Sequence, residues 1–112
     1  MVIEEIVRNY LLTKLTNIPI EVVEPTNAPS KYIVFRVINQ GIEDHIKAVT
    51  IEVLSYGGSV YEASSLNEEL KDAMLGIIEL DEIFSCKLGG GGSDFNNEMK
   101  SYRYRSYFNL YY

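Results

Sequence analysis

The sequence has no tryptophan, one cysteine, one histidine and three prolines among its 112 residues. A single cysteine excludes an intrachain disulfide. The chain also lacks CxxC, HExxH and dinucleotide-binding patterns and any recognisable Ser/His/Asp set, so no motif supports an enzyme, a cofactor site or a metal site. No apolar run approaches the roughly 20 residues that span a bilayer, and the chain is not expected to cross a membrane.

Length and net charge further restrict the kind of protein that this sequence can encode. A hydrophobic fraction of 46% with 23% charged residues is ordinary globular composition, and 112 residues predict one domain, residues 1–112. The net charge of -6 disfavours non-specific binding to nucleic acid, which depends on an excess of Lys and Arg. Glu4 and Glu5 stand where a signal peptide has basic residues, so we expect the protein in the cytoplasm of the cell that makes it.

Hydrophobic periodicity predicts two helices. Apolar residues recur at helical spacing between Val2 and Leu15, and Pro19 follows the end of this first helix. Ser59 and Glu62 form an S-x-x-E capping box, which predicts the start of a second, longer helix. The apolar stripe of the second helix comprises Val60, Ala63, Leu66, Leu70, Ala73, Met74 and Ile77.

Segments rich in β-branched and aromatic residues predict strands at 20–24, 31–38, 46–56, 81–88 and 100–111, with a turn at 39–41. Short connections favour antiparallel neighbours. The predicted fold class is α+β, a central, mainly antiparallel sheet of about five strands with the N-terminal helix and one long helix packed against it. The expected core residues are Ile33, Phe35, Val37, Val49, Ile51, Val53, Leu66, Leu70 and Ile77.

The predicted last strand carries aromatic residues on both faces. Side chains alternate along a strand, so Arg103, Arg105, Tyr107 and Tyr111 share the face opposite Phe108. Tyr and Arg are the residues that anchor protein interfaces, and we interpret this face as a contact with another subunit or another protein partner. The basic and aromatic run at 100–105 leaves a nucleic-acid-binding module as an alternative, against which the acidic net charge argues.

A glycine run, Gly89, Gly90, Gly91 and Gly92, predicts the tip of a hairpin. We expect this tip, with the polar segment that follows it and the lone Phe95 in that segment, to be mobile in the free subunit and to become ordered by contact with a neighbour. A mobile tip without function is the equally weighted alternative. A phosphate-binding loop is disfavoured, since no Lys and helix start follow the glycines.

Three further features have ordinary interpretations. Cys86 is expected to be a packed or half-exposed thiol in preference to a catalytic nucleophile, and His45, beside Glu43 and Asp44, a solvated turn residue in preference to a metal ligand. The remaining acidic residues predict a solvated surface in preference to a carboxylate pair. They are Glu68, Glu69, Asp72, Glu79, Asp81 and Glu82.

In the order of its elements the chain resembles the tail-completion or tail-terminator proteins of long, non-contractile-tailed phages and of prophages in Gram-positive bacteria. The resemblance covers nearly the whole chain and includes no catalytic signature. It lies in the first helix, the strand at 20–24, the proline-bearing segment to Pro29, Tyr32-Ile-Val-Phe-Arg-Val, the strand at 48–56 with Ser55-Tyr56, Ala63, Leu66 and Asn67 of the second helix, and Tyr102 to Arg105.

This resemblance implies a structural protein of the virion tail that forms a hexameric ring and stops polymerisation of the tail tube. Its implied partners are other copies of itself, the tail tube protein and a head-completion or connector protein, with DNA passing through the ring. The basic, aromatic strand face and the Glu-rich second helix would then be complementary contact surfaces. Another head–tail joining or tail-tube component, or a small-molecule-binding α+β domain, remains an alternative.

Overall fold

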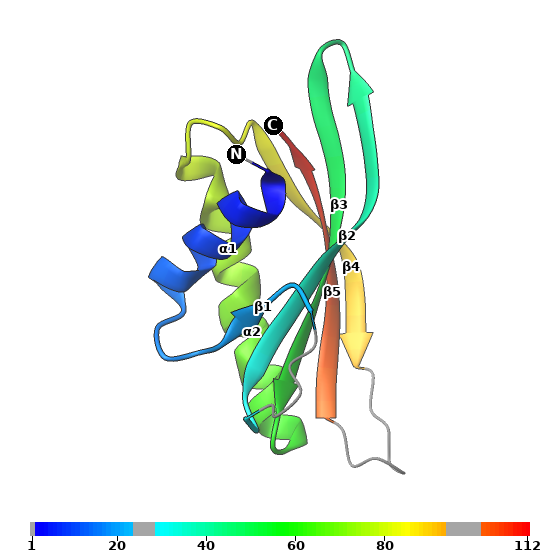
Figure 1. Cartoon of the computed structure of the whole chain (residues 1–112). Coiled ribbons are helices and arrows are strands. Elements are labelled where there is room, and N and C mark those ends of the chain that lie inside the picture. The colour runs from blue at the N-terminus through cyan, green and yellow to red at the C-terminus, as the bar shows by residue number, and fades with distance from the viewer. Residues whose placement is uncertain (1, 24–28, 94–101) are drawn as a thin grey trace.

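The computed structural model describes residues 2–23, 29–93 and 102–112, with the backbone alone at residue 43. The predicted α+β class is confirmed. Five strands, β1 (Ile20–Glu21), β2 (Tyr32–Glu43), β3 (Ile46–Gly57), β4 (Ser85–Ser93) and β5 (Tyr102–Tyr111), form one sheet in the order β1-β2-β3-β5-β4. Every neighbouring pair is antiparallel except β1 and β2. Both helices lie on the same side of this sheet (Figure 1).

The two helices form where hydrophobic periodicity predicts them, and the second begins at its predicted cap. Helix α1 covers Ile3–Lys14, and α2 covers Val60–Leu75 and continues as a 3-10 turn, η1, over Gly76–Glu79. The Ser59 hydroxyl accepts a hydrogen bond of 3.1 Å from the Glu62 amide, which confirms the predicted cap. On the sheet side of α2, the Ser106 hydroxyl donates to Asn67 Oδ1 at 2.8 Å, so a buried polar pair joins α2 to β5.

The core lies between the helices and the sheet. Of the nine residues predicted for it, all are buried except Val37, which packs against the core from its margin. Phe108 and Leu110 of β5 complete the sheet's contribution, while Ile6 and Leu11 belong to the apolar face of α1. Burial of these side chains is the main free-energy gain of folding, at roughly 1.5–3 kcal/mol for each large apolar residue.

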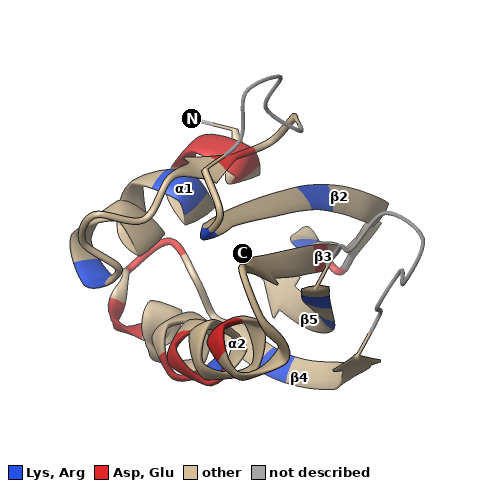
Figure 2. Cartoon of the chain, turned by 90° about the horizontal axis from the view of Figure 1, so that it is seen from below, with Lys and Arg blue, Asp and Glu red and all other residues tan. Residues whose placement is uncertain are grey.

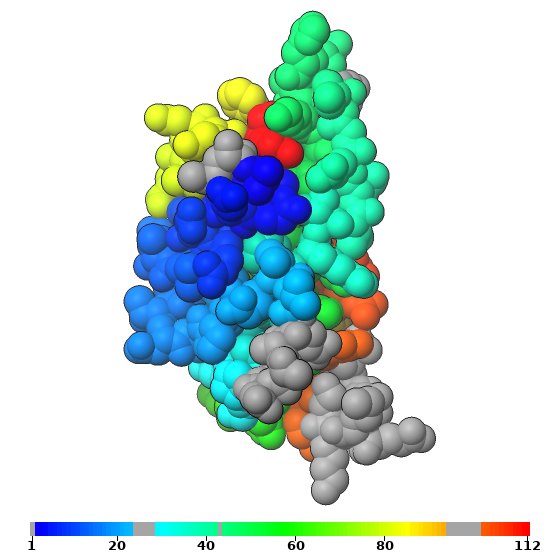
Figure 3. Space-filling model, in the orientation of Figure 1, coloured from blue at the N-terminus to red at the C-terminus, as the bar shows by residue number. Residues whose placement is uncertain are grey.

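The hairpin of β2 and β3 is longer than the sequence predicts. The predicted turn at 39–41 is wrong: β2 pairs with β3 as far as residue 43, with an irregularity between Val37 and Asn39. The chain reverses instead at Asp44 and His45, whose φ values of 51° and 68° suit a two-residue hairpin turn. The hairpin extends beyond the helices at the top of the molecule, as the space-filling view shows (Figures 1 and 3).

The glycine run is part of a strand, which corrects the predicted hairpin tip. Gly90, Gly91 and Gly92 pair with Tyr107, Ser106 and Arg105 of β5. A Cβ at Gly91 would lie 2.2 Å from the Arg105 carbonyl oxygen, and its φ of 156° is also unfavourable for other residues, so this position requires glycine. The predicted strand at 81–88 begins only at Ser85, and that at 20–24 covers two described residues. Phe95 and the predicted strand start at Lys100 lie outside the described residues.

Replacing glycines one at a time tests whether the run is a paired strand. Gly91→Ala should lower the free energy of unfolding by about 1–3 kcal/mol, because the new methyl group collides with the β5 backbone. Gly92→Ala is the matched control, since nothing lies within 4 Å of its Cβ position, and should change stability by less than about 0.5 kcal/mol. Urea unfolding measures both, and equal effects would contradict the pairing.

Candidate interface on the uncovered sheet face

The side of the sheet that faces away from the helices, here called the open face, is where β5 presents its basic and aromatic residues. Because side chains alternate, β2, β3 and β5 each contribute every second residue to it. Register places Arg36, Glu52 and Tyr107 in one row across the three strands, and Tyr32, Tyr56 and Arg103 in another. The open face therefore comprises Tyr32, Val34, Arg36, Glu52, Leu54, Tyr56, Arg103, Arg105 and Tyr107, with Asn109 and Tyr111 farther along β5.

Glu52 is the charged centre of the open face. Its side chain is only 5% exposed, although both described helices lie on the other side of the sheet. Arg36 donates from Nε to Glu52 Oε1 at 2.8 Å, and Arg105 Nε lies 3.6 Å from Glu52 Oε2. The two guanidinium groups come from β2 and β5, on either side of β3, so the carboxylate joins three neighbouring strands. A carboxylate so nearly buried is tolerated because it is hydrogen-bonded and paired with cations.

An aromatic stack lies beside this charged centre. The rings of Tyr32 and Tyr56 are parallel within 6°, with centroids 4.3 Å apart. Arg103 Nη1 donates to the Tyr56 hydroxyl at 3.0 Å, and its guanidinium carbon is 5.8 Å from the centre of that ring. This contact combines a hydrogen bond with a cation–π attraction, which holds a long side chain in one conformation. The open face is thus ordered by its own contacts.

The β5 residues that the sequence predicts for an interface do share this face. Arg103, Arg105 and Tyr107 are half-buried, and Tyr111 is 38% exposed. The glycine run lies beside them on β4, with Gly90 next to Tyr107 and Gly92 next to Arg105. The predicted Phe95 lies outside the described residues. Sequence analysis did not predict that Arg36, Glu52, Tyr32 and Tyr56 also belong to the open face, because their place there depends on strand register and not on a local motif.

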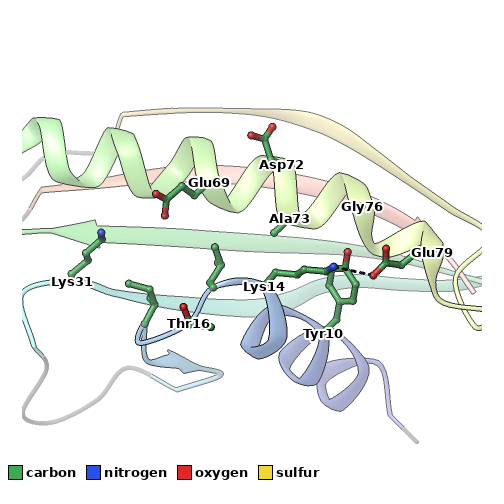
Figure 4. Close-up of a pocket in the computed structure, with 11 residues that line it drawn as sticks. Tyr10, Lys14, Thr16, Lys31, Glu69, Asp72, Ala73, Gly76 and Glu79 are labelled. Carbon is green, nitrogen blue, oxygen red and sulfur yellow. Dashed lines mark ion pairs between the residues drawn. The ribbon is translucent and has the colours of Figure 1, made fainter.

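Among the concavities that the described residues line, one lies on the open face and another between the helices. On the open face a hollow of about 260 Å³ is lined by Val22, Leu54, Glu52 and the two arginines that face Glu52. A wider groove of about 770 Å³ separates α1 from α2 on the other side of the sheet (Figure 4). Within the groove Lys14 Nζ lies 3.3 Å from Glu79 Oε1 and 5.5 Å from the centre of the Tyr10 ring. Burial, and then the nearby Glu79 carboxylate, raises the pKa of Tyr10.

The remaining features of the sequence lie apart from the open face. His45 is exposed in the hairpin turn, and the predicted acidic surface is exposed on and after α2 (Figure 2). Within the described part of the chain no three His, Cys, Asp or Glu side chains are grouped as metal ligands would be. Neither described helix has the length and apolar character to cross a membrane. Cys86 is half-buried against the core, as predicted.

Comparison with known proteins adds no family. No protein-family model matches the sequence, and a search of curated proteins finds no match.

Glu52 offers a test of how far the charged centre stabilises the sheet. Glu52→Gln keeps the shape but removes the negative charge facing two guanidinium groups, so the free energy of unfolding should fall by about 1–2 kcal/mol. The matched control is Glu68→Gln, which removes an exposed pair with Lys71 of 2.8 Å and should cost less than about 0.5 kcal/mol. Thermal and urea unfolding give both values. Equal losses would show that the partial burial of Glu52 is energetically unimportant.

Cys86 should be a poor nucleophile in the folded protein. Burial raises the pKa of the Cys86 thiol from 9.0 to about 11, and only the thiolate reacts. Alkylation at pH 8 should therefore be slowed about a hundredfold relative to the unfolded chain. Lys87→Cys in a Cys86→Ser background moves the thiol to the exposed neighbouring position and should react at the ordinary rate. Rapid alkylation of folded wild type would revive a reactive role for Cys86.

Proposed function

We propose that this protein is a structural component of phage tail assembly, of the tail-terminator type, which forms a ring at the end of the tail tube and stops its polymerisation. The observation that carries the proposal is the open face, a sheet surface with ordered Tyr and Arg side chains that neither of the described helices covers. Surfaces of this composition suit protein contacts. The resemblance in element order supplies the particular role.

The distribution of surfaces is compatible with a closed ring. Closed rings form from head-to-tail contacts, in which each subunit offers two different surfaces to its two neighbours. This chain has distinct surfaces on its two sides, because acidic residues gather on α2 while the arginines of the open face lie across the sheet (Figure 2). In such a ring the head-completion or connector protein and the tail tube protein meet opposite ends.

A nucleic-acid-binding module is the second candidate, favoured by three arginines and several tyrosines on one sheet face. Bases stack on aromatic rings, and guanidinium groups contact phosphates. Two features oppose it. Glu52 already faces Arg36 and Arg105, and the whole chain carries a net charge of -6. Both reduce the attraction for phosphate on which sequence-independent binding depends.

The mass of the protein in solution tests the assembly proposal. Light scattering across a range of concentrations should show a discrete particle, and the resemblance predicts six times the 12.8 kDa chain. A titration with fluorescent single- and double-stranded DNA near physiological salt should show no binding in parallel. A monomer at every concentration would contradict the proposal. Tight, salt-sensitive DNA binding that Arg103→Gln abolishes would favour the nucleic-acid module instead.

A further inference from the structure

The sheet ends in two edges whose backbone groups have no strand partner within the described residues. On one side β1 pairs with β2 only at Ile33 and Val34, so β2 is an edge from Phe35 onward. On the other side β4 pairs with β5 alone along Ser85–Ser93. A row of exposed amide and carbonyl groups is a template for pairing with another strand.

The two edges lie at the same height on the sheet. The register places Val37, Ile51, Phe108 and Leu88 in one row, and Gly41, Ala48, Tyr111 and Ser85 in a second. The free stretch of β2 from residue 35 to 41 is therefore level with the stretch of β4 from residue 91 to 85. Each stretch spans about seven residues, and the backbone groups of every second residue point outward from the sheet.

Strand directions also agree. Three successive antiparallel pairings, β2 with β3, β3 with β5 and β5 with β4, make β4 run opposite to β2. A second copy rotated about an axis along the strands keeps these directions. Its β4 would then lie antiparallel to β2 of the first copy, which is the more stable arrangement for adjacent strands.

Exposed apolar side chains occur at matching heights on the two edges. Ile42 is 75% exposed and Ile38 46% on the β2 side, while Phe84 is 67% exposed and Leu88 45% on the β4 side. Lys47 pairs with Ile42 and exchanges both backbone hydrogen bonds with Tyr112, which brings Ile42 level with Phe84. Contact between the edges would bring Ile42 against Phe84, both on the helix side of the sheet.

We infer that the free β2 edge of one copy pairs antiparallel with the free β4 edge of the next, so that one sheet continues from subunit to subunit. The glycine run suits this contact, because bare backbone on an edge strand admits another backbone closely. The open faces then form one continuous basic and aromatic surface, with the helices on the other side. This inference rests on the self-assembly proposed above. It assigns the contact between subunits to the two sheet edges instead of to the open face and the Glu-rich α2.

Disulfide trapping tests the contact between edges. In a Cys86→Ser background, Asn39→Cys and Lys87→Cys place two exposed thiols in one row and on one face of the sheet. They cannot join within one chain, because three strand spacings of roughly 4.8 Å separate them and a disulfide requires Cα atoms within about 7 Å. Strand tilt in a ring shifts edges by an even number of residues, so Gly41→Cys with Lys87→Cys is made alongside.

Mild oxidation of the assembled protein should give a ladder of covalent multimers that reductant removes. Each single-cysteine variant should give dimers at most. A ring without a ladder from either cysteine pair would overturn the contact between edges and leave the proposed function intact. Absence of a ring in wild type would instead overturn the proposed function, and the two failures are therefore distinguishable.

Charge substitutions separate this contact from packing of one subunit's open face on the next subunit's α2. Phe84→Asp should raise the concentration for half-assembly at least tenfold, because it places a carboxylate opposite Ile42. Tyr61→Asp is the matched control, since Tyr61 is 80% exposed and belongs to α2, not to either edge strand, and it should assemble as wild type. Arg103→Glu should likewise leave the ring intact. Loss of the ring in Arg103→Glu but not in Phe84→Asp would overturn the inference.

Discussion

The placement of β5 between β3 and β4 is the constraint on which the rest of the structure depends. From Tyr102 to Tyr111, every residue of β5 pairs with β3. Its other edge is the sole strand partner of β4 among the described residues, so without β5 the glycine-rich strand would have none. The same strand supplies Phe108 and Leu110 to the core and Arg103 and Arg105 to the open face. Folding and surface chemistry are therefore coupled through one segment.

Glu52 shows how that coupling shapes the open face. An isolated carboxylate so little exposed would be costly, and the arginines on both flanking strands offset the cost. Glu52 in turn orients the side chains of Arg36 and Arg105, and Tyr56 orients that of Arg103. When a partner binds such an ordered surface, less side-chain entropy is lost. An ordered face therefore binds more tightly than a flexible face of the same composition.

Local patterns predicted the elements whose causes are local. The cap at Ser59, the periodicity of both helices and eight of the nine proposed core residues agree with the structure. The predictions failed where pairing with a neighbouring strand determines the local structure. Asn39 to Gly41 has turn composition but is held in β2 by β3, and Gly89 to Gly92 is held in β4 by β5. The Glu52 cluster depended on three registers at once, which no single segment encodes.

The proposed contact between edges also bears on why assembly would close. Free edges and exposed apolar side chains are an aggregation hazard, and a net charge of -6 opposes indiscriminate association of copies. Pairing between two unlike edges can continue without end unless the rotation between copies returns the last subunit to the first. Closure into a ring then satisfies every edge, as a β-barrel does. The right-handed twist of the strands provides a rotation between copies, and the twist therefore bears on whether the sheet closes or extends as a fibre.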